Sequence, residues 1–172
     1  MEIDYMEDII EKYQFSIFKY CFQMLRCKET AEDITQEVFI KFSQISKKKI
    51  YSNNYLYSIA HSKCIDYLRR EKRKKIFIKS YKRKTYEIST EDLISENEYS
   101  KEIKTALKSL TCYEKSVLLL KSVNGFTYKE MSNILNKKES ALRKQFQRAK
   151  IKIGKELNKK GVMINNEEIS IL

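Results

Sequence analysis

The strongest chemical signal in the sequence is a group of basic, amide and hydroxyl side chains between residues 140 and 148. Ser140, Arg143, Lys144, Gln147 and Arg148 recur at helical spacing, on one face of an expected helix and its flanks. Arg and Lys fit guanine edges and phosphates, and Gln fits adenine. The group therefore indicates contact with a DNA groove. A helical hairpin with a solvated basic face is the alternative that these residues leave open.

A second cluster, YLYSIAHSKCIDYLRREKRKK at residues 55–75, interleaves aromatic residues with a helix that becomes strongly basic. The segment before it, KKKIYSNN at residues 47–54, adds stackable and hydrogen-bonding side chains and is expected to be a loop. Aromatic and amide groups beside a cationic track suit exposed single-stranded bases. A packed helix with core tyrosines and a solvated basic end explains the cluster equally well. For His61 we expect a surface or packing role rather than a catalytic one.

A third group is the polar face formed by Asp33, Gln36, Glu37 and Lys41 on an amphipathic segment. Two carboxylates at this spacing raise the question of acid/base catalysis. Neither a glycine-rich loop nor a set of nucleophile and metal ligands accompanies them in the sequence. We therefore expect this face to dock a protein partner, or to be solvated, and we expect no enzymatic activity.

Composition limits the class of partner. The chain of 172 residues has 35 Lys+Arg against 23 Asp+Glu, a net charge of +12. This excess favours a polyanion, either nucleic acid or an anionic membrane surface. No stretch approaches the roughly 18 apolar residues of a membrane span. The acidic N-terminus MEIDYMEDII does not resemble a signal peptide, so a cytoplasmic location is expected.

The cysteines do not indicate metal or redox chemistry. The sequence has four of them, without a CxxC pair, and a single histidine, which cannot complete a zinc site. We expect reduced, buried, structural cysteines and no cofactor or metal. The four are Cys21, Cys27, Cys64 and Cys112.

Charge also divides the chain. Residues 69–84 carry ten Lys/Arg and one Glu, whereas residues 87–102 carry six acids and one Lys. This polar, acidic stretch is expected to be a flexible linker between two small helical domains. The expected organisation is an all-α fold with domains at residues 1–84 and 102–160, a linker at residues 85–101 and a tail at residues 161–172.

Apolar periodicity predicts helices throughout both domains, and the absence of Pro with only three Gly agrees with this. In the first domain the stripes run through residues 5–25, 28–45 and about 54–72. In the second, Thr111 with Glu114 and Thr127 with Glu130 form T-x-x-E capping boxes that open two helices. Gly125 is expected to end the first of these in the left-handed conformation, and Asn136 can end the second in the same way. A last helix follows from Glu139 to about residue 157, completing a helix-turn-helix. Its expected apolar stripe is Leu142, Phe146, Ala149, Ile153 and Leu157.

These motifs together resemble the bacterial sigma-70 family of RNA polymerase sigma factors, of the extracytoplasmic-function (ECF) type. AEDITQEVFIKFSQ resembles the helix that binds core polymerase, with its D-x-x-Q-E-x-F pattern, and residues 55–75 resemble the helix that melts and reads the −10 element. LTCYEKSVLLLKSVNGFTYKEMSNILNKKESALRKQFQRAKIKI resembles the domain that reads the −35 element. The resemblance spans about residues 5–157 in the family's order.

The chain departs from the family pattern at four places. Tyr55 replaces the usual Trp, and Ser62 stands where Asn is common. NKKES replaces the turn G-x-S-x-G, so Lys138 takes the place of a small N-cap residue, at a cost of about 1 kcal/mol to the helix. Gln145 stands where a basic residue is frequent. The last two departures make this chain's −35 preference the hardest property to infer.

The resemblance implies three sets of site residues. The set for core polymerase is Asp33, Gln36, Glu37, Phe39 and Lys41. The set for the −10 element is Lys49, Asn53, Asn54, His61, Lys63, Arg69, Arg70, Arg73 and Lys74. The set for the −35 element is Ser140, Arg143, Lys144, Gln147 and Arg148.

The function implied is a transcription initiation factor that directs core RNA polymerase to −35/−10 promoter elements and helps to melt the −10 element. Its implied partners are core polymerase and promoter DNA, with an anti-sigma factor as a further partner of such proteins. The alternative is a conventional helix-turn-helix regulator, which would bind duplex DNA tightly by itself, typically as a dimer. A membrane-surface protein is disfavoured, because the basic segment lacks a large, bulky apolar face.

Overall fold

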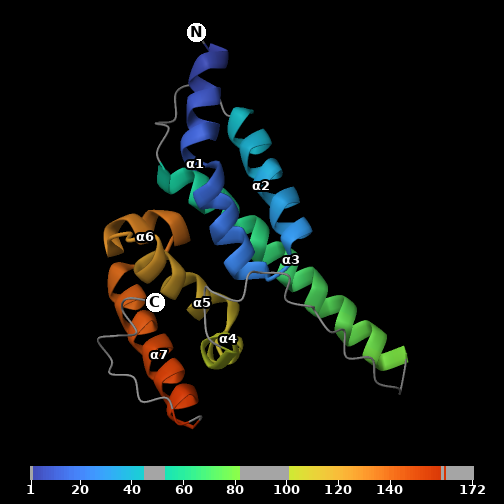
Figure 1. Ribbon diagram of the computed structural model, residues 1–172, viewed down its shortest axis with the longest axis vertical. Coiled ribbons are helices and arrows are strands. Elements are labelled where there is room, and N and C mark those ends of the chain that lie inside the picture. Colours follow the sequence, from blue (N-terminus) through green and yellow to red (C-terminus); the bar gives the residue numbers. More distant parts are fainter. Residues whose placement is uncertain (1, 45–52, 82–100, 160, 162–172) are drawn as a thin grey trace. The chain divides into compact units, whose positions relative to one another are not determined.

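The computed structural model describes residues 2–44, 53–81, 101–159 and 161 (Figure 1). Every regular element in these ranges is a helix, which confirms the predicted all-α fold. The chain divides into two compact units, Met1–Leu93 and Ile94–Leu172. The expected linker lies outside the described residues apart from Lys101, which begins a helix, and the expected tail lies outside them apart from Gly161.

The first unit is a three-helix bundle of α1 (Glu2–Leu25), α2 (Lys28–Ser43) and α3 (Asn53–Tyr81). Each helix packs against the other two. The core is built from the predicted apolar stripes, and Ile17, Val38 and Leu56 are among its most deeply buried side chains. Arg26, at φ 59°, turns the chain sharply between α1 and α2, a conformation that non-glycine residues adopt uncommonly.

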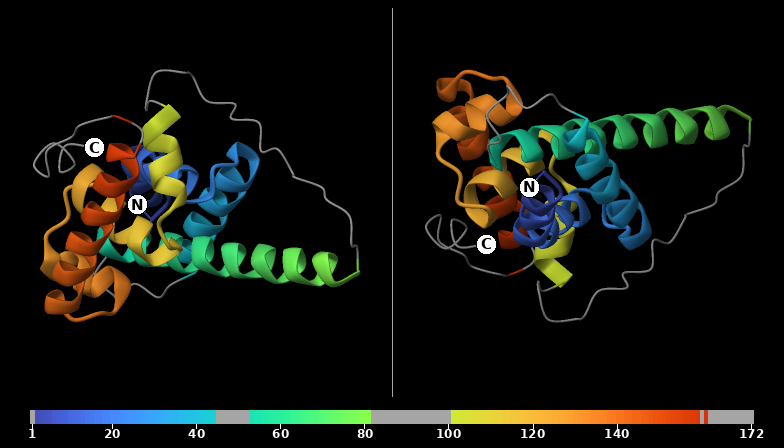
Figure 2. Two further views of the ribbon diagram at one scale, coloured as in Figure 1. Left: turned by 90° about the horizontal axis from the view of Figure 1, so that it is seen from below. Right: turned by 90° about the horizontal axis from the view of Figure 1, so that it is seen from above.

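Helix α3 begins within one residue of its predicted start near Asn54 but ends later than the sequence predicts. Asn53 and Asn54 both belong to its first turn, so the loop expected over residues 47–54 is shorter at its end. The helix also continues to Tyr81 instead of ending near residue 72, and this part extends beyond α1 and α2 (Figures 1 and 2). Lys, Arg and Glu are good helix formers and no Gly or Pro interrupts them, so the charged segment propagates the helix without an apolar stripe.

The second unit consists of α4 (Lys101–Lys108), α5 (Cys112–Leu118), η1 (Leu119–Val123), α6 (Tyr128–Leu135) and α7 (Glu139–Asn158). Helix α7 packs against α4, α5 and α6 and forms the spine of this unit (Figure 1). Its predicted stripe is confirmed, because Leu142, Phe146, Ala149, Ile153 and Leu157 are all buried.

Local capping sets where the helices of the second unit begin and end. Both predicted capping boxes are present, with the Thr111 and Thr127 hydroxyls each accepting a hydrogen bond from the backbone N–H three residues later. Gly125 at φ 70° and Asn136 at φ 50° take the left-handed conformation, as expected. The sequence does not predict η1, a π-helical turn that carries the chain from α5 to Asn124.

The cysteine prediction is confirmed in part. All four cysteines are free thiols, and Cys21 and Cys64 are buried. Cys112 is exposed, so the prediction of a buried cysteine is wrong there: it occupies the first residue of α5, where the capped end faces outward. Cys27 is only partly buried.

The described residues contain neither a membrane-spanning helix nor a cluster of metal ligands. Among residues 2–44, 53–81 and 101–159, no helix has the length and hydropathy needed to span a bilayer. In the same part of the chain, no group of three or more His, Cys, Asp or Glu side chains is arranged to hold a metal ion.

Candidate nucleic-acid and polymerase interfaces

The face of α7 proposed for DNA contact is fully displayed in the structure. Its five side chains are exposed, while the stripe on the other side of the helix is buried against the unit. The apolar packing of the helix therefore leaves the groups that suit base edges and phosphates exposed. The exposed five are Ser140, Arg143, Lys144, Gln147 and Arg148.

The turn into α7 confirms the predicted departure at its N-cap. Asn136 ends α6 in the left-handed conformation, and Lys138 occupies the N-cap of α7 without a side-chain hydrogen bond. Only its carbonyl participates, accepting bonds from the N–H groups of Ala141 and Leu142. Helix α7 thus starts without the side-chain cap that α5 and α6 both have.

Arg143 is the most constrained cation of this face. Its guanidinium lies 3.7 Å from the Glu139 carboxylate, one turn earlier, and 4.4 Å from the centre of the Tyr128 ring on α6. The pKa of Tyr128 is raised by burial, and the nearby Arg143 opposes that rise. Tyr128 is not among the residues that the sequence predicted for this face. A tyrosine at the first position of α6, outside the helix's apolar stripe, is the signal that could have revealed it.

The C-terminal half of α7 is fastened by a buried carboxylate. Glu114 accepts the Thr111 backbone N–H in the capping box of α5 and also pairs with Lys152 of α7 at 2.6 Å. Burial alone would raise the pKa of Glu114, but hydrogen bonds from Lys152 and Thr111 lower it below its usual value. One side chain therefore both caps α5 and holds α7 against it, and sequence spacing gave no sign of the second role.

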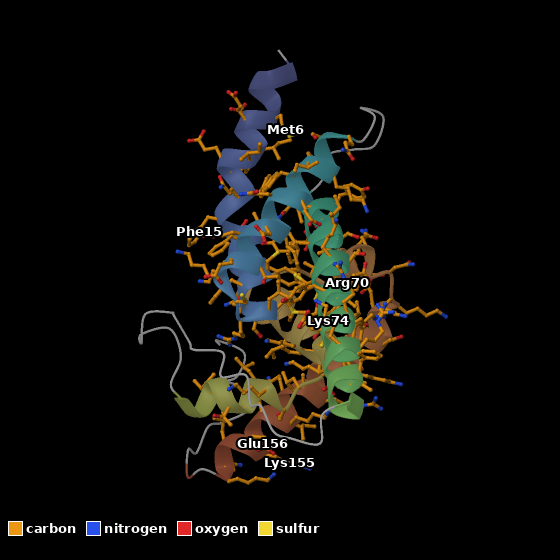
Figure 3. The ribbon with its side chains drawn as sticks, turned by 90° about the vertical axis from the view of Figure 1, so that its right-hand side faces the viewer. Met6, Phe15, Arg70, Lys74, Lys155 and Glu156 are labelled. Atoms are coloured by element: carbon orange, nitrogen blue, oxygen red, sulfur yellow. The ribbon has the colours of Figure 1, made fainter. Side chains whose placement is uncertain are left out.

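The proposed −10 surface of α3 is basic along the part that extends from the bundle. Arg69, Arg70, Arg73 and Lys74 are all exposed, and Figure 3 shows Arg70 and Lys74 on neighbouring turns. Lys74 pairs with Glu71 at 2.9 Å, a surface contact between an exposed and a half-buried side chain. Such pairs are weak, so these cations can exchange their present partners for phosphates at little cost.

Asn53 and Asn54 stand at the opposite end of α3, on its first turn, and both are half-buried. Lys49, proposed for the same site, lies outside the described residues. The two asparagines and the basic segment therefore lie at opposite ends of one helix.

The sequence left two interpretations open for the tyrosines of α3, stacking on unpaired bases or packing in the core, and the structure separates the residues between them. Tyr57 is a core residue, 3% exposed, with its ring edge-on to Tyr20 at 5.5 Å. Tyr55 is half-buried beside Phe42, and Tyr67 also keeps part of its surface exposed. Stacking on a base is therefore open to Tyr55 and Tyr67 but not to Tyr57.

His61 is half-buried and makes the packing contact that its residue type favoured, while its place in the −10 set stays a prediction. Its Nδ1 lies 3.2 Å from the Tyr20 hydroxyl, which links α3 to α1. Burial, and then the positive charge of Arg69, lower the pKa of His61 to about 4. The ring is therefore neutral at pH 7 and adds no positive charge to the basic surface.

The acidic face of α2 is exposed at four of its five proposed positions. Asp33, Gln36, Glu37 and Lys41 point away from the core. Phe39 is only 8% exposed, so its ring belongs to the core rather than to the contact surface. The position beside Val38 and one turn before Phe42 places it on the buried side of the helix.

Glu37 connects this face to the nucleic-acid surface. Its carboxylate pairs with Lys63 of α3, a residue proposed for the −10 site. The two proposed surfaces of the first unit therefore share an ion pair, and Lys63 is already partly neutralised where it stands.

An open groove lies beside the acidic face. It encloses about 470 Å³ between α1 and α2. Phe15 on its rim is 74% exposed, and Figure 3 shows this residue on α1. The groove was not predicted from the sequence, because Phe15 lies outside the apolar stripe of α1. The lining residues are Glu11, Gln14, Phe15, Phe18, Glu32, Thr35 and Gln36.

The chain matches two models of one protein family. Sigma-70 region 2 matches residues 9–74, and Sigma-70 region 4 matches residues 100–153. The chain is 27% identical over 164 residues to RNA polymerase sigma factor YlaC of Bacillus subtilis, covering 91% of this chain and 94% of YlaC. It is 25% identical over 149 residues to ECF RNA polymerase sigma factor SigX of the same species, covering 78% and 74%.

A solved structure supports the fold. The sigma factor RpoE of Bartonella quintana, crystallised with the anti-sigma factor NepR, matches with a TM-score of 0.70 at 16% identity, over 88% of this chain and 96% of RpoE. The two family models together span most of the chain, in the order in which the motifs occur. This chain therefore belongs to the sigma-70 family of RNA polymerase sigma factors, in its ECF group.

Proposed function

We propose that this chain acts as a transcription initiation factor that binds core RNA polymerase, directs it to −35/−10 promoter elements and helps to melt the −10 element. The observation that carries the proposal is the presence of sigma-70 region 2 and region 4 on one chain, in that order. Each region also displays a basic helix face that its own packing leaves exposed. The bond-forming chemistry belongs to the polymerase, and the chain acts in the cytoplasm, where polymerase works.

The acidic face of α2 is the proposed contact with core polymerase. Asp33, Gln36, Glu37 and Lys41 are available there, while Phe39 supports the helix from the core. Asp33→Arg is the sharpest test, because this exposed residue can be reversed in charge without disturbing packing. We expect this variant to lose co-purification with core polymerase while melting at the temperature of the wild type. Undiminished co-purification would exclude this face.

The proposed −10 site combines the two ends of α3. The amide side chains of Asn53 and Asn54, together with Lys49, would capture an unstacked base of the non-template strand. Extruding a base costs a few kcal/mol, which stacking and hydrogen bonds in a protein site offset. The exposed cations at residues 69–74 would hold the phosphates of the melted or flanking DNA.

The proposed −35 reader is α7 in the major groove. Arg143, Lys144 and Gln147 have the types that read base edges, whereas Ser140 and Arg148 suit phosphate contacts or base edges. The region boundaries proposed here are residues 1–84 and 102–160, with a linker between them and a tail after residue 160. An anti-sigma factor is proposed as a further partner, since the Bartonella quintana relative was crystallised with one.

The proposal is tested by run-off transcription with bacterial core polymerase on a library of genomic fragments. We expect the protein to be inactive alone and to produce a discrete set of transcripts when core polymerase is present. The competing function is that of a conventional helix-turn-helix regulator. It predicts that the isolated protein binds duplex DNA specifically, and that adding the protein to core polymerase produces no new transcripts. That result would overturn the proposal.

A further inference from the structure

The Tyr128 ring is in contact with cations from two other elements of its unit, η1 and α7. Tyr128 is the first residue of α6, and its ring lies edge-on to Phe146 of α7, with the ring centres 6.4 Å apart. Two cations approach the same ring, Arg143 at 4.4 Å and Lys121 at 5.1 Å from its centre. The ring is half-buried, so it is fixed by packing before any ligand arrives.

Of these two cations, Arg143 depends on the ring more strongly. Lys121 has a second anchor, since its Nζ donates a hydrogen bond to the Phe126 carbonyl at 3.2 Å. Among the residues that the structure describes, the polar partner of Arg143 besides the ring is the exposed carboxylate of Glu139 at 3.7 Å, a weak surface pair. An aromatic face attracts a guanidinium and stacks with its plane. The orientation of the Arg143 fork is therefore set chiefly by Tyr128.

A fixed guanidinium matters for reading DNA. Bidentate recognition of a guanine edge requires the fork to be presented in one plane, and a flexible arginine loses more freedom when it binds. Tyr128 supplies this preorganisation from outside the recognition helix. Its position on α6 gives Arg143 an anchor on a second helix, next to the N-terminus of α7 that has no side-chain cap.

We propose that Tyr128 is a positioning residue that orients Arg143 and thereby sets base discrimination at the −35 element. The proposal rests on the proposed −35 function of α7 and adds a residue that is not in its contact face. It assigns the effect to the aromatic face of Tyr128 and not to its hydroxyl.

The test uses the full chain with core polymerase and run-off transcription from one responsive promoter. A set of templates changes each −35 base pair in turn, and discrimination is the transcript ratio between the original and the changed base pair. The variants are Tyr128→Phe, which keeps the ring face, Tyr128→Leu, which keeps an apolar contact with Phe146, Arg143→Ala, and Tyr128→Leu combined with Arg143→Ala. Tyr113→Leu, at another half-buried tyrosine of this unit, measures the general cost of losing a phenol ring.

Arg143→Ala should reduce discrimination at one or two base pairs. Tyr128→Leu should reduce it at the same base pairs by about two- to five-fold, the factor that corresponds to a cation–π contact at an exposed site. Tyr128→Phe should match the wild type. The double variant should be no worse than Arg143→Ala, and Tyr113→Leu should leave the discrimination pattern unchanged.

Four results would overturn the proposal. A uniform loss across all templates in Tyr128→Leu, with the pattern of base preference intact, would mean that the ring only stabilises the fold. Equal losses in Tyr128→Phe and Tyr128→Leu would assign the effect to the hydroxyl, for example through a phosphate contact. If Arg143→Ala changes discrimination at no base pair, the −35 assignment of α7 fails as well, whereas a silent Tyr128→Leu beside an active Arg143→Ala removes only the positioning role.

Discussion

Helices α3 and α7 carry similar charge but are supported in different ways. Helix α7 buries side chains along nearly its whole length, from Leu142 to Leu157. Over residues 53–77, the part of α3 whose side chains the structure describes, the buried residues run from Leu56 to Cys64, and residues 65–77 are all half-exposed or exposed. One basic helix is thus held by tertiary packing, whereas the extended part of the other has no buried side chain among these residues and carries local ion pairs.

The difference fits the two kinds of contact proposed for these helices. Reading a base edge requires side chains placed within a fraction of an ångström, which a packed helix provides. Holding phosphates requires positive charge in roughly the right place, and an extended charged helix is sufficient for that. We therefore expect mutations to be costly for folding in α7 and tolerated in the extended part of α3.

The largest expected effect compares one isoleucine from each helix. Ile153→Ala should lower the free energy of unfolding by about 2–5 kcal/mol, because the side chain is 1% exposed and its loss leaves a cavity. Ile76→Ala should change it by less than about 0.5 kcal/mol, because that side chain is 60% exposed. Chemical denaturation followed by circular dichroism measures both. Similar losses would mean that the end of α3 is packed, contrary to this account.

The next effect concerns acid stability in the first unit. The pKa of His61 is about 4 in the folded chain against 6.5 for the ordinary group, so the unfolded chain binds more protons between these values. The contribution of His61 to the free energy of unfolding is therefore fully present above pH 6.5. It is lost as the pH drops towards 4, by up to about 3 kcal/mol. His61→Gln should lose less stability than the wild type across this window.

Denaturation midpoints at several pH values measure that difference, and comparison with the wild type removes the contribution of the carboxyl groups that titrate in the same range. Parallel profiles for the two proteins would show that His61 is not protonated on unfolding, contrary to the burial described here.

A smaller effect is expected at the capping box of α6. Thr127→Ala removes the hydroxyl that accepts the Glu130 backbone N–H, and it should cost about 1 kcal/mol. Thr105→Ala, at an exposed site within α4, is the matched control and should cost much less. Thermal melts of the full chain check both. Equal costs would show that the Thr127 cap adds nothing to stability.

The smallest effect should be a gain. Lys138→Ser places a capping hydroxyl at the bare N-cap of α7, and it should stabilise the chain by about 0.5–1 kcal/mol. Lys137→Ser, one residue earlier, controls for the loss of a lysine. A higher melting temperature for Lys138→Ser alone is the expected result. No difference between the two variants would show that α7 gains nothing from a side-chain cap.

The features that the sequence predicted well have local causes. The capping boxes at Thr111 and Thr127, the left-handed Asn136 and the stripe of α7 follow from short-range spacing, and the structure confirms each. The length of α3 was underestimated, because helical propensity continued after the apolar stripe had ended. The groove beside Phe15 and the pairing of Tyr128 with Arg143 depend on which helices meet, which short-range spacing does not give. The burial of Phe39 did have a local sign, its place between Val38 and Phe42 on the apolar side of α2.

The division of labour between α3 and α7 is tested most directly by run-off transcription with core polymerase on two templates, one fully duplex and one with the −10 element already opened by mismatches. The account predicts that Asn53→Ala combined with Asn54→Ala loses most activity on the duplex and recovers much of it on the opened template. Arg143→Ala should lose a similar fraction on both, since −35 reading precedes opening. Equal losses for both variants on both templates would contradict the account.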